Sequence, residues 1–138
     1  MVPIGAASIG AGASLTDGGE PIVLFFYGGG DQVFDVDYVF YGAPSASNPM
    51  IDKTGVVRGA WSYLADTPAA AQHAVAAPGD TGSIHRCVYA ESHETTSLGN
   101  GIAGHDETSE DASVAFRLGG AAGDRTPGGP PPAALCAK

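Results

Sequence analysis

The amino-acid sequence predicts an all-β chain of antiparallel strands with one short helix. Its 138 residues include 21 glycines and 10 prolines, which is typical of a turn-rich chain because both residue types interrupt helices. Residues 21–27 are an apolar run with β-branched or aromatic side chains at five of seven positions, which favours a strand. In residues 33–41 one alternating set of positions is wholly apolar and the other carries Asp35 and Asp37 beside Val33, Val39 and Tyr41, as in a half-buried antiparallel strand.

Residues 21–41 are therefore expected to form a β-hairpin that turns at the glycines 28–30. In its second strand the even-numbered residues from 34 to 40 are all apolar and would share one face. Asp35 and Asp37 fall on the opposite face, where we expect them to lie in water.

Three further strands are expected after this hairpin, over residues 50–58, 84–90 and 113–118. Arg86 lies in one of them, and an arginine within an apolar strand is costly unless it is paired or exposed. We expect its side chain to reach the acidic segment 105–111 and hold that segment against the sheet.

One helix is expected over residues 69–77, a segment rich in alanine. Thr67 can serve as its N-cap, and Pro68 would occupy the first helical position. A Pro-Gly-Asp sequence at residues 78–80 would end it.

The length and composition predict one domain with two flanking segments. Residues 1–14 form an arm rich in glycine and alanine, residues 15–118 the β domain, and residues 119–138 a disordered tail rich in proline and glycine. The N-terminal residues lack the basic and leucine-rich regions of a signal peptide. No apolar stretch approaches the ~20 residues of a membrane span.

The net charge of −9 comes from 15 acidic and 6 basic residues. Such a surface disfavours nucleic acid and anionic membranes as partners, and leaves cations and basic protein surfaces as electrostatic partners. The favoured interpretation is a solvated acidic surface, typical of a secreted or salt-adapted protein.

Two cysteines are present, Cys87 in a predicted strand and Cys136 close to the C-terminus. A disulfide between them would attach the tail to the domain, but their spacing does not show one. Two free thiols are the alternative.

Two groups of residues contain ligands that metal ions use. In the first, Asp31, Asp35 and Asp37 could offer carboxylate oxygens to Ca²⁺. Their spacing does not match an EF-hand loop, and the favoured interpretation is the wet face of a strand. The second group comprises His93, Glu94, His105, Asp106 and Glu107, and Glu110 is a further candidate carboxylate for Ca²⁺.

Histidines and carboxylates of this second group could hold zinc with one open position. The group lacks an HExxH motif and any ligand pair at helical spacing. A hydrogen-bonded loop is therefore favoured, in which Asp106 and Thr108 cap backbone amides and His105 bonds to a carbonyl or carboxylate.

No catalytic motif stands out, because the chain has neither a Gly-x-Ser-x-Gly elbow nor a phosphate-binding fingerprint. We therefore expect a protein that is not an enzyme. The glycine-flanked polar run at residues 99–110 is expected to be a structured surface loop or a binding site.

Several segments occur in an order that resembles the bacterial lamin tail domain, an immunoglobulin-like β-sandwich module of secreted and envelope proteins. The most specific is the Gly-His-Asp-Glu-Thr-Ser-Glu run at residues 104–110. The resemblance covers about residues 15–128 of the chain. Its segments are residues 24–41, 52–56, 66–69, 83–86, 99–110 and 126–128.

This resemblance implies an immunoglobulin-like antiparallel β-sandwich, a protein or cell-surface ligand as partner, and an extracellular or envelope location. It carries over no catalytic residues. The family's opening strands are not found before residue 15. Either the chain begins inside the domain, or its glycine-rich arm is a shortened replacement. An incomplete sandwich would leave an unpaired edge beside residues 22–27.

The leading hypothesis is a non-catalytic β-sandwich interaction module. The alternative is a Ca²⁺-dependent binding module that uses carboxylates of residues 31–37 or 106–111. A third is a small zinc hydrolase that uses His93 and His105.

Overall fold

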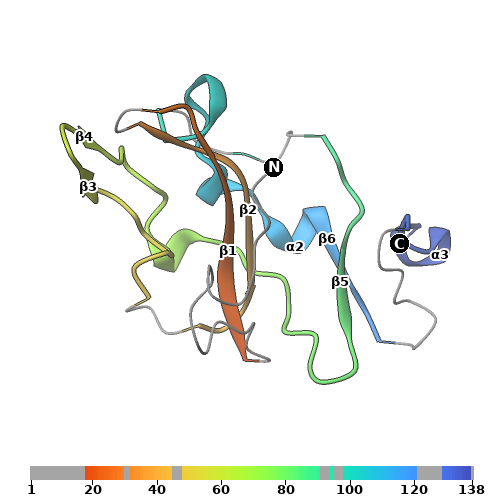
Figure 1. Ribbon diagram of the computed structural model, residues 1–138. Coiled ribbons are helices and arrows are strands. Elements are labelled where there is room, and N and C mark those ends of the chain that lie inside the picture. Colours follow the sequence, from red (N-terminus) through yellow and green to blue (C-terminus); the bar gives the residue numbers. More distant parts are fainter. Residues whose placement is uncertain are drawn as a thin grey trace, which may run out of the picture.

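A computed structural model describes residues 18–29, 32–44, 48–90, 94, 98–120 and 129–137. This part of the chain is mostly strand, with short helical turns, and its strands form three two-stranded antiparallel pairings (Figure 1). The strands are β1 (Gly19–Tyr27), β2 (Val33–Gly42), β3 (Val57–Arg58), β4 (Trp61–Ser62), β5 (Ser83–Arg86) and β6 (Phe116–Gly119). The helical turns are η1 (Ala69–Ala71), η2 (Ile102–Gly104), η3 (Glu107–Ser109), α2 (Ala112–Ala115) and α3 (Ala133–Cys136).

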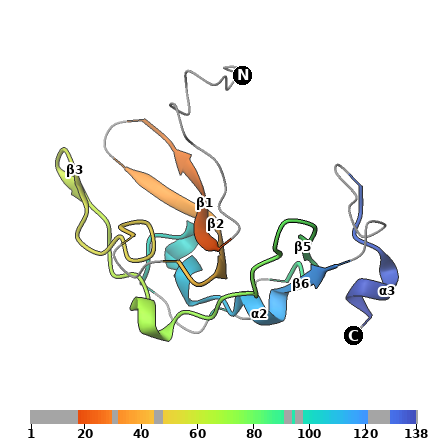
Figure 2. The same ribbon diagram turned by 90° about the horizontal axis from the view of Figure 1, so that it is seen from below.

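The predicted hairpin is confirmed, and β1 pairs with β2 from Gly19 opposite Gly42 to Tyr27 opposite Val33. The hairpin lies between the short β3–β4 pair at one end of the molecule and the β5–β6 pair at the other (Figures 1 and 2). Gly19 and Gly42 both have positive φ, and a Cβ on either would overlap the backbone of the other strand. Glycine at both positions therefore allows the two strands to approach closely.

The prediction that Asp35 lies in water is wrong, and Asp37 is only partly exposed. Leu24 pairs with Asp37 and Phe25 with Asp35, so the register shifts at a β-bulge and strict alternation breaks there. Asp35 is 2% exposed and lies beside Lys53, and Asp37 forms an ion pair with Arg86. The Asp35 carboxylate is buried and the Asp37 carboxylate is partly covered, because later parts of the chain pack against β2 and supply cations.

The main cluster of the hydrophobic core is small and lies between β2, α2 and β6. Its buried members are Tyr41, Val75, Ala112, Ala115 and Phe116. Val39 and Ile84 pack against this cluster. Ala115 is completely buried, so α2 approaches the strands through its small side chains.

The helix expected over residues 69–77 ends after one turn at Ala71, and Gln72 is already extended. Val75 instead forms a parallel bridge with Tyr41, and its N–H donates to the Phe40 carbonyl at 2.9 Å. Backbone pairing with β2 thus overrides the helix propensity of the alanines. Similarly, the last strand starts only at Phe116, because the preceding residues form α2.

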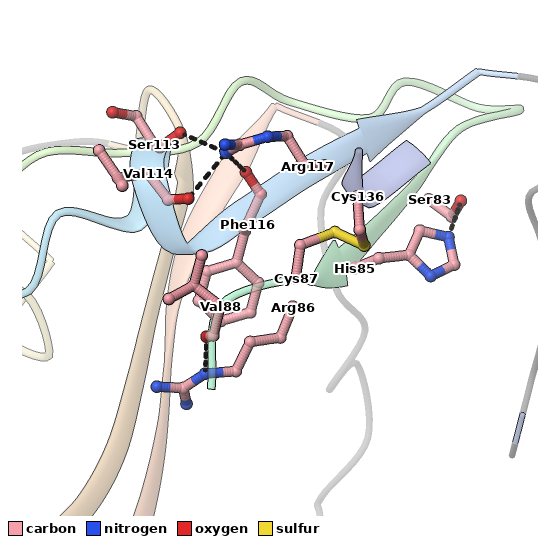
Figure 3. The surroundings of a disulfide bond; sticks show 10 residues. All are labelled: Ser83, His85, Arg86, Cys87, Val88, Ser113, Val114, Phe116, Arg117 and Cys136. Atoms are coloured by element: carbon pink, nitrogen blue, oxygen red, sulfur yellow. Dashed lines mark hydrogen bonds between the residues drawn. A yellow bond between two sulfur atoms is a disulfide. The ribbon is translucent and has the colours of Figure 1, made fainter. Parts of the chain in front are cut away.

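The structure joins Cys87 and Cys136 in a disulfide, with 5.2 Å between their Cα atoms (Figure 3). Cys87 follows β5 directly and Cys136 is the last residue of α3, so the bond ties α3 to the β5–β6 pair. The whole predicted arm, residues 1–14, and residues 121–128 and 138 of the predicted tail lie outside the described residues. No helix in the described ranges is long and apolar enough to cross a membrane.

Candidate functional site

Strand β1 presents the largest run of exposed apolar side chains in the described part of the chain. Ile22, Leu24, Phe25, Phe26 and Tyr27 are 39 to 59% exposed. Within the described ranges β2 is the only strand paired with β1, so β1 lies at an edge of the sheet that these ranges form. An edge strand with large exposed apolar side chains is a template for pairing with another chain.

An apolar hollow lies at the turn end of the hairpin. It measures about 470 Å³ and is lined by Phe26 and Phe34 of the hairpin and by Ile102 and Ala103 of η2. Phe26 and Phe34 face each other across the two strands. The hollow therefore extends the apolar surface of β1 onto η2.

Residues 99–110 form a hydrogen-bonded polar loop, as predicted, but residues 106–110 are buried and do not lie at the surface. Asp106 accepts hydrogen bonds from the backbone N–H and the hydroxyl of Thr108 and from the hydroxyl of Thr67. A Cβ at Gly99 would lie 2.6 Å from the Asp106 backbone. The glycine at this position thus lets the loop close on Asp106.

The Asn100 side chain fixes the same loop to the segment that follows β4. Its amide oxygen accepts from the Leu64 N–H at 2.7 Å, and its amide nitrogen donates to the Leu64 carbonyl at 3.2 Å. The backbone carbonyl of Asn100 accepts a hydrogen bond from the Asp35 N–H at 3.0 Å. Gly101 also forms an isolated parallel bridge with Asp35, so the loop pairs with β2 at this point.

Replacing Thr108 by valine is expected to lower the free energy of unfolding by about 2 kcal/mol. Thr108 is fully buried, and its hydroxyl also accepts from the Thr67 N–H at 2.8 Å. Valine keeps the shape but leaves that N–H and one Asp106 oxygen without this partner. Urea unfolding measures the loss, and Thr108→Ser, which keeps the hydroxyl, should be closer to the wild type. Equal losses in both variants would contradict this role.

Arg86 reaches the acidic segment, as predicted. Its guanidinium donates to Asp37 at 2.6 Å and to Glu110 at 3.2 Å. Its Nε donates to the Val88 carbonyl, and its guanidinium lies over the Phe116 ring (Figure 3). Arg86 thus connects β5, the hairpin and the polar loop.

The carboxylates considered as metal ligands have protein partners. Asp35 contacts Lys53, Asp37 and Glu110 contact Arg86, and Asp106 accepts from threonines. His105 Nδ1 lies 2.9 Å from Glu94. Glu107 is buried, and its Oε1 occupies the space that a side chain at position 101 would need. Asp31 and His93 lie outside the described residues. Among those described, no group of three His, Cys, Asp or Glu residues is placed to hold a metal ion.

A buried lysine is the feature that the sequence did not reveal. Lys53 Nζ lies 3.2 Å from Asp35 Oδ2 and 2.8 Å from Asp66 Oδ2, and all three side chains are at most 2% exposed. Tyr38 and Tyr63 place their rings over the ammonium group. Burial raises the pKa of Asp35, and the charge of Lys53 opposes that rise. Burial also raises the pKa of Tyr38.

No protein-family model, curated protein or solved structure matches this chain. The exposed strand, the polar loop and the buried lysine are the features of the described residues that bear on function.

Proposed function

We propose that the chain is a non-catalytic interaction module of a secreted or envelope-associated protein, with an immunoglobulin-like sandwich of the lamin tail type. The observation that carries this proposal is the exposed apolar edge strand β1. Large exposed apolar patches on soluble proteins mark interaction sites. The favoured occupant of β1 is a second copy of the same chain.

Charge favours pairing of β1 with itself. Residues 21–30 contain no charged side chain, although the whole chain carries −9. Two antiparallel copies of β1, related by a twofold axis, would therefore place no like charges opposite each other along this run. The remaining acidic surfaces would repel, so salt should strengthen the association.

The available area also suits a dimer. Phe25, Phe26 and Tyr27 are about half exposed, and aromatic side chains of this kind bury about 150–250 Å² each. With Ile22 and Leu24 they offer about 500 Å² of exposed apolar surface per copy. A standard interface buries roughly 800 Å² on each partner, and the lining of the hollow supplies part of the remainder. Two hairpins joined through β1 would form a four-stranded sheet, which is more stable than an isolated two-stranded one.

The disulfide supports a location outside the reducing cytoplasm. Structural disulfides persist in secreted and envelope proteins and are rare in the cytosol. The Cys87–Cys136 bond therefore agrees with the location that the lamin tail resemblance implies.

Sedimentation of the wild type over a range of concentrations should show a reversible monomer–dimer equilibrium. Phe25→Lys should weaken dimerisation at least about tenfold, because a charge would be buried in the interface. Val57 is a matched control, since it is exposed on β3 and Val57→Lys makes the same change of charge. Added salt should favour the dimer.

A wild type that stays monomeric at all concentrations and salt levels would overturn the dimer. Equal weakening by Phe25→Lys and Val57→Lys would show that the contact lies elsewhere. Repeating the series with Ca²⁺ and with a chelator tests the cation-dependent alternative, because that module would associate only when Ca²⁺ is present.

A further inference from the structure

The buried group Lys53, Asp35 and Asp66 brings an amine into contact with two carboxyl groups. Lys53 Nζ lies 2.8 Å from Asp66 Oδ2 and 3.2 Å from Asp35 Oδ2. The three residues come from separate parts of the chain: Asp35 from β2, Lys53 from the loop before β3, and Asp66 from the segment after β4. A covalent bond within this group would therefore link distant segments.

The two aspartates differ in their surroundings. Asp66 Oδ2 also accepts a hydrogen bond from the Lys53 backbone N–H at 2.8 Å, so this carboxylate is held in place beside the amine. Asp35 Oδ1 is buried and has no hydrogen-bond partner among the described residues. Burial raises the pKa of Asp35 and so favours its neutral acid form. A neutral carboxylic acid is a better acceptor for an amine than a carboxylate.

The environment also suits condensation. A desolvated lysine amine beside a proton acceptor is an activated nucleophile. The near-complete burial of all three side chains excludes the water that would hydrolyse the product. Fixed positions at contact distance replace a bimolecular encounter and raise the effective concentration of the reacting groups by orders of magnitude.

We propose that the folded chain forms an intramolecular isopeptide bond between Lys53 Nζ and Asp35 Cγ, with Asp66 as the proton acceptor. Asp66 takes one proton from the Lys53 ammonium, and the free amine attacks the neutral Asp35 carboxyl group. The new N–C bond forms and a C–O bond breaks. The departing hydroxyl leaves as water with a second proton from the nitrogen. One proton remains on Asp66, and nothing is oxidised or reduced.

Such a bond would close a ring between β2 and the loop that precedes β3. This region carries the hairpin whose apolar strand is exposed, and a covalent ring would resist its unfolding. The bond does not depend on the proposed function, because it requires only that the chain folds.

The test is the intact mass of the folded, purified chain after reduction of the disulfide. We expect a mass lower than that of the sequence by one water molecule. Proteolytic digestion followed by tandem mass spectrometry should give a branched peptide that joins the segments around Asp35 and Lys53. A folded wild type with the full sequence mass overturns the proposal. A branch between Lys53 and Asp66 overturns the assignment of Asp35 as the acceptor.

Variants test the roles of the individual residues. Lys53→Arg keeps the positive charge but removes the nucleophile, and its mass should equal the full sequence mass. Asp66→Ala should lose most of the bond while both bonding residues remain. Asp52→Asn is the matched control, because Asp52 is next to Lys53 but exposed, and it should still lose water. Circular dichroism shows whether each variant folds. If Asp66→Ala does not fold, the mass of the folded wild type still decides the proposal.

Discussion

Replacing both Cys87 and Cys136 by serine is expected to lower the free energy of unfolding by about 4 kcal/mol. The disulfide spans a sequence separation of 49 residues. A cross-link of this length removes much of the conformational entropy of the unfolded chain and so favours the folded state. The bond also holds α3 beside β6, and we expect α3 to detach in the serine variant.

Urea unfolding of the wild type and of the double serine variant measures this loss. Reductant should destabilise the wild type by a similar amount, and the double variant should not respond to reductant. An equal midpoint for the oxidised wild type and the double variant would show that α3 and its bond contribute nothing to stability.

The elements that could be predicted from the sequence are those fixed by local patterns. The hairpin over β1 and β2 follows from a long apolar run, a glycine turn and an alternating run. The polar loop follows from Asp106 and Thr108, because an aspartate two residues before an N–H donor can cap it without any distant contact.

Two features that depend on distant contacts were predicted wrongly, although the contact of Arg86 with the acidic segment was predicted correctly. Asp35 was placed in water because alternation alone cannot show the bulge opposite Leu24 and Phe25. Nor can it show that Lys53 approaches this strand. The alanines after Ala71 have high helix propensity, yet Val75 pairs with Tyr41. The pairing supplies hydrogen-bond partners for backbone groups at an edge of β2.

Two features lay beyond sequence reasoning for the same reason. The Cys87–Cys136 bond depends on where α3 lies in space, and sequence spacing carries no information on that position. Lys53 and Asp66 are 13 residues apart, and no local pattern in the sequence marks their charges as buried partners. Only the folded chain shows that their side chains are buried with Asp35.

Replacing Arg86 by alanine is expected to lower the free energy of unfolding by about 3 kcal/mol, because removing one partner of a buried ion pair leaves the other charge uncompensated. Glu110, whose side chain is 2% exposed, would lose its ion pair with Arg86. Asp37, whose side chain is 32% exposed, would lose the shorter of the two ion pairs that Arg86 makes. The Phe116 ring would also lose its contact with the guanidinium. The polar loop should loosen first, because Arg86 links it to β5.

Urea unfolding and amide hydrogen exchange measure the global and the local effect of Arg86→Ala. Arg117→Ala is the matched control: it makes the same change of charge, but Arg117 donates only to backbone carbonyls of residues 113, 114 and 116 in the described part of the chain (Figure 3). It should cost about 1 kcal/mol. Adding Glu110→Gln to Arg86→Ala should recover part of the loss, because the uncompensated buried charge is then gone. Equal losses for the two arginine variants, with no recovery in the double variant, would show that Arg86 contributes only as an ordinary surface side chain.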